Sequence, residues 1–270
     1  MWKHHWRLSR DPFLDGGTAY VATASHDEAV ARLVHTIETA QPRAIVQAEA
    51  GAGKSVVLRR ALAETRGPMR RVSSVTSPAD GAGMLAALAE GLGVRVAPTA
   101  GRGACWKALL DAVRLCRWQR LHVVLTIDAA QDLAATADRH DLERLVHLDP
   151  HPEGRVTVLP VFRTPEPSAE GPPRPTWDLA IRIPPLTRSE TEQYVTAKLS
   201  AAGRDEPTFT PRALHRLHAA ATGLPRGSDR LASRALMAGA VRGLEMVTPE
   251  VVEGVLPECE GPVPLVPLGR

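Results

Sequence analysis

The stretch Ala44-Ile45-Val46-Gln47-Ala48-Glu49-Ala50-Gly51-Ala52-Gly53-Lys54-Ser55 decides the fold. An apolar run ends in a loop of small residues, and Lys-Ser then opens the helical pattern of residues 56–60. This order predicts a strand, a phosphate-binding loop and a helix, because loop N–H groups and a helix N-terminus both present donors to an anion. We therefore expect nucleotide to contact Ala48, Glu49, Ala50, Gly51, Ala52, Gly53, Lys54 and Ser55.

Two residues of the loop have distinct expected roles. Lys54 would reach the outer phosphates of a nucleotide, and Ser55 would ligate Mg²⁺. The chain has only four lysines, at positions 3, 54, 107 and 198, and otherwise uses arginine as its cation. A lysine kept here favours phosphate binding over a chance Lys-Ser in a small-residue turn, because a guanidinium would not fit the same cradle. Ala48 departs from the usual motif, which has glycine there, and its methyl is expected to tighten or reshape the turn.

The composition sets broad limits. A chain of 270 residues, with 44% hydrophobic and 23% charged residues, can bury the core of one large domain or two small ones. A net charge of +3 permits contact with nucleic acid without arguing for it. Cys105, Cys116 and Cys259 lack metal-type spacing and suit reduced thiols. With neither a signal-type N-terminus nor a long apolar run, we expect a cytoplasmic protein without a membrane span.

Hydrophobic periodicity divides the chain into four parts. Residues 1–25 are predicted to be an extended arm, 26–185 an α/β core that binds nucleotide, 186–256 a helical lid and 257–270 a flexible tail. Strands are expected at 44–47, 71–75, 121–128, 156–162 and 179–183, and a surface loop at 164–177. Ser25 and Thr187 each begin a Ser/Thr-x-x-Glu capping box, and Thr210-Pro211 begins another helix. The fold class is therefore α/β, a parallel sheet flanked by helices, with a small C-terminal all-α lid.

A nucleotide-binding site of this kind also needs an acidic residue at the end of a second strand. Asp128 ends an apolar strand, where open α/β sheets bind their ligands, and would help to hold Mg²⁺. The alternative is a strand-end Asp that caps the next turn. The following position, where a glutamate would orient the attacking water, is Ala129, so the usual general base is missing. Gln131 and Asp132 are weak substitutes, because a base must lie within hydrogen-bond reach of that water.

Two further positions are candidates for sensing the γ-phosphate. Arg163-Thr164 follows the strand at 156–162, although a plain loop start explains both residues equally well. Arg226 stands at a helix start, in Gly223-Leu224-Pro225-Arg226, where the helix dipole disfavours a cation unless an anion faces it. Arg226 is therefore either a lid arginine that touches nucleotide or a solvent-facing side chain.

Together these motifs resemble the ExeA-like group of AAA+ P-loop ATPases, the general secretion pathway A type, which is related to transposition helper ATPases. The resemblance covers residues 6–256. It rests on the shared order of Trp6-Arg7-Leu8 with Asp11-Pro12-Phe13, Tyr20 with His26-Asp27-Glu28-Ala29, residues 127–133, Ile183-Pro184-Pro185-Leu186 with Glu190-Thr191 and Tyr194, and Gly223-Leu224-Pro225-Arg226 with Asp229-Arg230-Leu231. It implies an AAA+ fold that binds ATP and Mg²⁺ and a possible homo-oligomer, since such relatives usually form rings.

The departures from the family pattern concentrate around the γ-phosphate. They are Ala48 for glycine, Ala129 for the catalytic glutamate, and Arg163-Thr164 where the family has Gly-Gln. The leading hypothesis is an ATP-bound switch for assembly or for an unidentified protein or DNA partner, with weak or absent hydrolysis. The alternatives are an active secretion-type ATPase that uses Gln131, Asp132 or a neighbouring subunit, an ATP-dependent DNA-binding regulator of transposition type, and a degenerate scaffold that binds no nucleotide. No arginine finger can be assigned.

Overall fold

The computed structural model describes residues 2–14, 19–78, 80–133, 136–148, 155–164 and 177–257. The chain forms two compact units, which are described separately. The α/β unit contains residues 26–50 and 57–184, and the helical unit contains residues 1–25, 51–56 and 185–270. Almost all of the surface loop expected at 164–177, and all of the tail expected at 257–270 except its first residue, lie outside the described residues.

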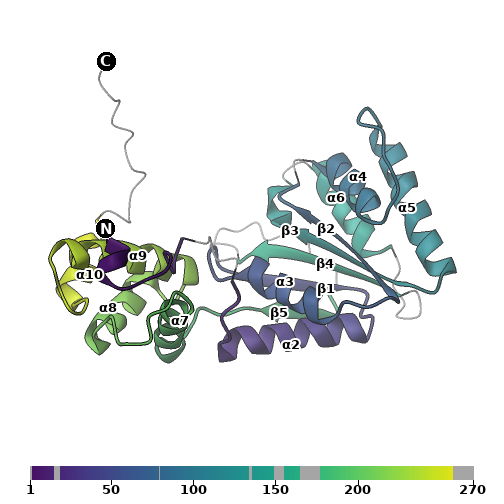
Figure 1. The fold of residues 1–270 in the computed structure, drawn as a ribbon. Helices are drawn as coiled ribbons and strands as arrows, with labels where there is room; N and C mark the ends of the chain where they lie inside the picture. The colour runs from purple at the N-terminus through teal and green to yellow at the C-terminus, as the bar shows by residue number, and fades with distance from the viewer. Residues whose placement is uncertain are drawn as a thin grey trace, which may run out of the picture. The chain divides into compact units, whose positions relative to one another are not determined.

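The α/β unit is built on a sheet of five parallel strands in the order β2-β3-β4-β1-β5 (Figure 1). The strands at the centre are buried on both faces, which explains why they read as nearly continuous apolar runs in the sequence. All five predicted strands are present, with ends that differ by at most one residue. The bounds are β1 (Ala44–Ala48), β2 (Arg70–Thr76), β3 (His122–Asp128), β4 (Val156–Arg163) and β5 (Leu179–Arg182).

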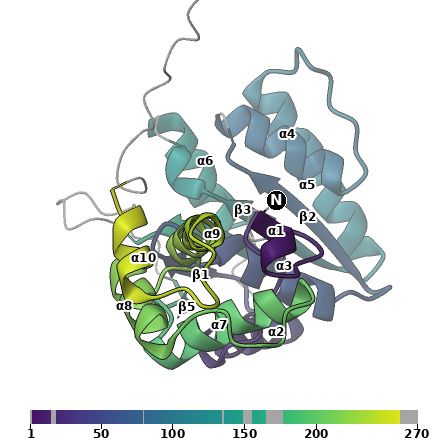
Figure 2. The same ribbon diagram turned by 60° about the vertical axis from the view of Figure 1, so that its left-hand side comes forward.

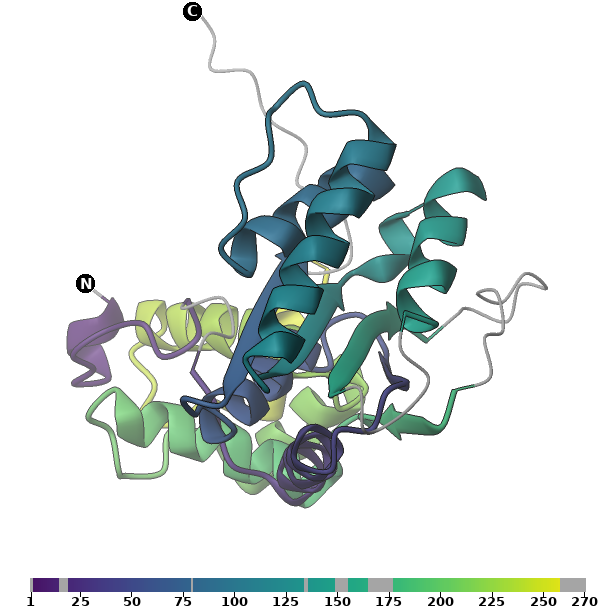
Figure 3. The same ribbon diagram turned by 90° about the vertical axis from the view of Figure 1, so that its right-hand side faces the viewer.

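Helices cover both faces of this sheet. One face carries α4 (Gly81–Gly91), α5 (Arg102–Trp118) and α6 (Thr136–Val146), and the other carries α2 (Ala24–Glu38) and α3 (Lys54–Glu64) (Figures 1 and 3). A short 3₁₀ helix, η1 (Ala130–Asp132), follows β3. A buried apolar cluster fills the layer between the strands and α4, α5 and α6. This three-layer arrangement is the α/β architecture that the alternating strands and helices predict.

A polar cluster joins the helices of that layer. The Arg102 guanidinium, at the start of α5, lies 2.6 Å from a carboxylate oxygen of Asp138 and 2.6 Å from one of Asp141 on α6. The Trp106 indole N–H donates to the other Asp141 oxygen at 2.8 Å. Both carboxylates are buried, so each depends on these donors to offset the loss of water.

The helical unit contains five helices within the described residues (Figure 2). The predicted capping box of α7 is confirmed, because Thr187 N–H donates to Glu190 at 2.8 Å and Glu190 N–H donates to the Thr187 hydroxyl at 3.3 Å. The predicted start of α8 is confirmed by the Ala213 N–H, which donates to the Thr210 hydroxyl at 3.1 Å. The bounds are α1 (Trp2–His5), α7 (Arg188–Ala201), α8 (Pro211–Ala221), α9 (Pro225–Val241) and α10 (Pro249–Val255).

Two expectations about the N-terminal segment were wrong. The arm is not simply extended, because residues 2–5 form α1 and Trp6 is 1% exposed, with its indole N–H donating to the Leu236 carbonyl at 2.8 Å. A four-residue helix is too short to show periodicity. It is held by the buried Trp6 indole and by a His5 ring nitrogen that lies 2.8 Å from the Leu244 carbonyl. The capping box expected at Ser25 is also not formed, since α2 begins at Ala24 and the Ser25 N–H donates instead to Glu190 at 2.6 Å.

A buried ion pair lies at the centre of the helical unit. The Lys198 ammonium on α7 is 3.0 Å from both carboxylate oxygens of Asp229 on α9. The Tyr194 hydroxyl donates to the same carboxylate at 3.1 Å, and the ammonium also lies 5.7 Å from the centre of the Phe13 ring. This cluster therefore ties α7, α9 and the N-terminal arm together.

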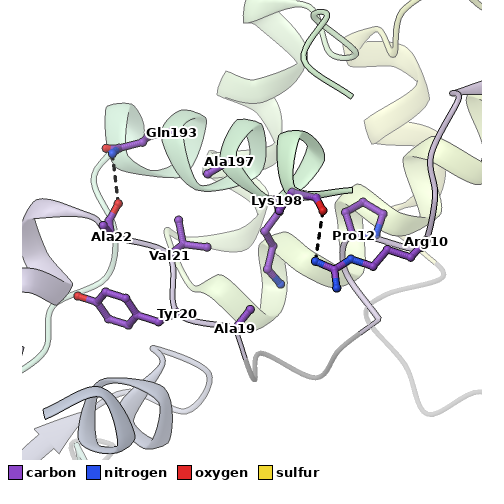
Figure 4. Close-up of a pocket in the computed structure, with 10 residues that line it drawn as sticks. Arg10, Pro12, Ala19, Tyr20, Val21, Ala22, Gln193, Ala197 and Lys198 are labelled. Atoms are coloured by element: carbon purple, nitrogen blue, oxygen red, sulfur yellow. Dashed lines mark hydrogen bonds between the residues drawn. The ribbon is translucent and has the colours of Figure 1, made fainter. Parts of the chain in front are cut away.

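The arm and α7 also enclose a pocket of about 330 Å³ (Figure 4). Tyr20 and Val21 line it from the arm, and Gln193 and Lys198 from α7. The Gln193 side chain donates to the Ala22 carbonyl at 3.2 Å, which fixes the arm along the helix. No helix within the described ranges is long and apolar enough to cross a membrane.

Candidate nucleotide-binding site

The phosphate loop has the backbone of an anion cradle. Gly51 and Gly53 both have a φ of +89°, a conformation that residues with a Cβ rarely adopt, and Ala52 between them is fully buried. Such alternation turns loop N–H groups toward a common concavity, which suits a phosphate. Lys54 and Ser55 follow directly as the first residues of α3. The segment 51–56 therefore presents backbone donors, an ammonium and a hydroxyl in succession.

Arg226 lies next to this loop within the helical unit. Its backbone N–H, at the start of α9, donates to the Gly51 carbonyl at 3.2 Å. A Cβ added to Gly51 would lie 2.9 Å from the Arg226 Cβ, so only glycine fits this approach. The Arg226 side chain is exposed. The structure thus brings together the loop and the candidate lid arginine, a pairing for which their separation in sequence gave no direct signal.

Asp128 occupies the carboxyl end of β3 in the α/β unit. Its Oδ1 accepts the N–H of Ala129 at 2.9 Å, and its carbonyl accepts the Ser77 N–H at 3.0 Å. Ala129 has a left-handed backbone, with φ 58° and ψ 41°, so the chain turns sharply directly after the carboxylate. The contact expected of a turn-capping Asp is therefore present, and the same carboxylate stands at the strand end where ligands of open sheets bind.

The other candidates of the α/β unit gather at the ends of β1 and β4. Thr164 N–H donates to the Ala48 carbonyl at 2.9 Å, and Arg163 N–H donates to the Gln131 side-chain oxygen at 3.1 Å. The Gln131 amide group donates in turn to Asp132 at 3.2 Å. Ala48 is the last residue of β1 and has no positive φ, so its methyl does not face the strain of a left-handed backbone. Glu49 and Ala50 are exposed and lead out of the strand.

The residues available for a metal ion are few. Among the described residues, no group of three or more His, Cys, Asp or Glu side chains could hold a metal ion. Ser55 and Asp128 offer a hydroxyl and a carboxylate oxygen, which are the hard donors that Mg²⁺ prefers. Mg²⁺ commonly uses one or two protein ligands and completes its shell with water and substrate phosphates, so this donor set fits it.

The sheet order, the glycine cradle after β1 and the acidic end of β3 define a P-loop fold of the AAA+ ATPase class. Residues 38–162 match the AAA domain family, and the predicted resemblance to ExeA-like AAA+ ATPases is confirmed. Over 59 residues the chain is 41% identical to general secretion pathway protein A of Aeromonas hydrophila. This alignment covers 22% of the chain and 11% of that relative.

Several solved structures share the fold. Cdc6p of Pyrobaculum aerophilum superposes with a TM-score of 0.70 at 17% identity, over 90% of this chain and 69% of that one. The ORC1 protein of Aeropyrum pernix, solved in complex with DNA, superposes with a TM-score of 0.66 at 19% identity, over 92% of this chain and 69% of that one. Drosophila ORC bound to DNA superposes with a TM-score of 0.72 at 14% identity, over 96% of this chain and 66% of that one. At these identities the likeness establishes the fold alone.

Proposed function

We propose that this chain binds ATP with Mg²⁺ and uses the bound nucleotide as a switch for assembly or partner binding, with weak or absent hydrolysis. In this proposal the loop residues 48–53 surround the phosphates, Lys54 contacts the outer ones, and Ser55 and Asp128 hold the metal ion. Arg226 is the lid residue that senses the nucleotide. The Mg²⁺ ion would neutralise phosphate charge when bound.

Binding is supported by the backbone of the loop. The positive φ angles of Gly51 and Gly53 and the buried Ala52 give the loop a shape that needs glycine, and α3 starts directly behind it. Helix N-termini and such loops favour anions because their N–H groups point toward a common site and the helix dipole is positive there. The AAA+ family generally binds ATP with Mg²⁺, which makes this the ligand to test first.

Weak hydrolysis is supported by Ala129. This residue has no acceptor for a water proton and holds the position after Asp128 in a left-handed turn. Of the two weak substitutes, Gln131 already accepts the Arg163 N–H and donates to Asp132. Both side chains are thus held by contacts within the protein, and an amide such as Gln131 is not a base, which argues against efficient activation of water by this pair.

The partner is proposed from the relatives. One is named for the general secretion pathway, and two of the structures with this fold are bound to DNA. A protein of a secretion assembly, a DNA partner and a further copy of this chain are therefore the partners to test, in a cytoplasmic setting.

The deciding experiment measures ATP binding by calorimetry with and without Mg²⁺, and phosphate release in the same samples. The wild type is expected to bind ATP with negligible release, and Lys54→Ala should lose binding at least tenfold. Lys107→Ala is the matched control, because this exposed lysine on α5 pairs with Asp111 at 2.8 Å, away from the loop in sequence. Equal binding by Lys54→Ala, or turnover of several ATP per second by the wild type, would overturn the proposal.

A second variant tests the missing carboxylate directly. Ala129→Glu restores an acceptor where the family has its catalytic glutamate, and Ala129→Gln is the uncharged control. If the absent base limits turnover, the Glu variant should release phosphate at least tenfold faster than the wild type, whereas the Gln variant should not. An unchanged rate in a Glu variant that still binds ATP would mean that another defect limits hydrolysis.

A further inference from the structure

Arginines gather at the edge of the sheet opposite the candidate site. The parallel strands β2, β3 and β4 all begin at this edge, and α5 ends beside them (Figures 1 and 3). The chain places there what we call the arginine surface: Arg70, Arg71, Arg120, Arg155 and Trp118. The stretches 65–71 and 114–122 contain no acidic residue.

Hydrogen bonds between these segments show that they are close in space. The Arg155 guanidinium donates to the Arg120 carbonyl at 3.2 Å, and the His122 N–H donates to the Met69 carbonyl at 2.9 Å. Burial lowers the pKa of His122 to about 4, and the nearby Arg70 and Arg155 charges add to this effect. Arginines thus stand at the starts of three neighbouring strands, which lie about 5 Å apart in a sheet.

The acidic residues described near the end of α5 are paired with other cations. Asp111, one turn before Arg114 on α5, already pairs with Lys107 and Arg114 at 2.8 and 3.4 Å. Farther along the same edge, Arg43 before β1 is paired with Asp178 before β5 at 2.8 Å. Among the residues that the structure describes, arginines therefore outnumber acids where β2, β3 and β4 begin and α5 ends.

Trp118 adds an aromatic plane to this surface. It is the last residue of α5 and is 82% exposed, which is unusual for so large an apolar side chain. Aromatic faces beside fixed cations are the pattern that binds single-stranded nucleic acids, because bases stack on the ring while arginines contact phosphates. The guanidiniums of Arg70, Arg71 and Arg155 are tied to carbonyl groups, which favours directional phosphate contacts.

We infer that the arginine surface binds single-stranded nucleic acid, with the backbone phosphates on the arginines and one base stacked on Trp118. An anionic membrane fits less well, since the other exposed apolar side chains nearby are only Met69 and Leu115, each about half exposed, among the described residues. An acidic peptide would satisfy the charges but would leave the indole face without a stacking partner. This inference does not depend on nucleotide binding.

The test measures fluorescence anisotropy of a labelled 20-nucleotide single strand at several salt concentrations, without ATP. We expect salt-dependent binding, tighter than for the duplex of the same sequence. Trp118→Leu should weaken binding at least about fivefold, whereas Trp118→Phe should change it less than twofold, because stacking needs a ring and not only an apolar side chain. The high exposure of Trp118 means that neither variant should alter the melting temperature.

Charge variants complete the test. Arg71→Ala should weaken binding and reduce the salt slope by about 0.7 for each phosphate that the variant no longer neutralises. Arg212→Ala, an exposed arginine on α8, is the matched control and should leave both unchanged. Lys54→Ala should bind the single strand as the wild type does. A failure of the proposed ATP site can therefore be distinguished from a failure of the arginine surface.

Three results would overturn the inference. They are no binding of the strand at low salt, equal affinity for duplex and strand with no effect of Trp118→Leu, and preferential binding to polyglutamate or to vesicles with phosphatidylglycerol.

Discussion

Replacing Asp229 with asparagine removes the counter-charge of a buried lysine without changing the shape of the side chain. In the native structure the side chains of Lys198 and Asp229 are 3% and 10% exposed, and the ammonium lies 3.0 Å from both carboxylate oxygens. The variant would leave the ammonium buried beside a neutral amide. The ammonium also lies over the aromatic rings of Phe13 and Tyr194, at 5.7 and 5.2 Å from their centres.

The expected loss follows from removing one charged partner of a buried ion pair. Removing one partner of such a pair typically costs about 3–5 kcal/mol. The asparagine oxygen still accepts one hydrogen bond, so we expect the low end, about 3 kcal/mol of unfolding free energy. For a protein of this size that corresponds to a fall of roughly 6–12 °C in melting temperature.

The assay is urea unfolding followed by circular dichroism, with calorimetry to resolve transitions of the two units. A double variant, Lys198→Met with Asp229→Leu, should recover most of the loss, because apolar replacements of a buried pair are often neutral. Arg212→Ala serves as a surface control. A loss below about 0.5 kcal/mol in Asp229→Asn would refute the reasoning, since it would mean that water reaches the lysine.

Three further variants test other parts of the structure. Gly51→Ala should weaken ATP binding at least tenfold and cost about 1–2 kcal/mol of unfolding free energy, because a Cβ at φ +89° is strained and meets Arg226; unchanged calorimetric titration and melting would contradict this. Burial raises the pKa of Glu190, but hydrogen bonds from Thr187 and Ser25 outweigh it and hold that pKa at about 2, so the stability that this residue contributes is present above pH 4.5 and is lost as the pH falls toward 2. Unfolding curves between pH 2 and 6 should show this loss in the wild type and a smaller one in Glu190→Gln. Arg102→Ala should lower the free energy of unfolding in urea, because it removes a guanidinium that lies 2.6 Å from each of two buried carboxylates, and an unchanged unfolding midpoint would contradict this.

Most of the fold is predictable because its strands and helices have clear signals in the local sequence. The buried strand at 122–128 is a run of apolar residues ended by an acid, and the helix starting after Thr187 has a complete capping box. Their order then implies a parallel sheet with a helical lid. Helix α1 could not be predicted from the sequence, because its four residues make little more than one helical turn and show no periodicity. Its position depends on the contact of Trp6 with Leu236, which is distant in sequence.

The candidate site is predictable in its residues and not in its contacts. Lys54, Ser55 and Asp128 stand out because their chemistry and position match a phosphate loop and a strand end. The contact of Gly51 with Arg226 joins residues 175 positions apart, and nothing local encodes it. The bond from Arg163 N–H to Gln131 is equally hidden, because it depends on how β4 and η1 meet. The arginine surface is likewise assembled only when the strand starts come together.

The division of the chain has a consequence for any coupling between ligand and conformation. The backbone passes between the two units four times, after residues 25, 50, 56 and 184. Two of these passages lie inside α2 and α3, and a continuous helix resists bending. Another is the stiff Pro184-Pro185 pair. The remaining passage is Ala50-Gly51, which neither a helix nor a proline pair stiffens. A ligand that holds the first glycine of the anion cradle would therefore also restrict this passage between the units.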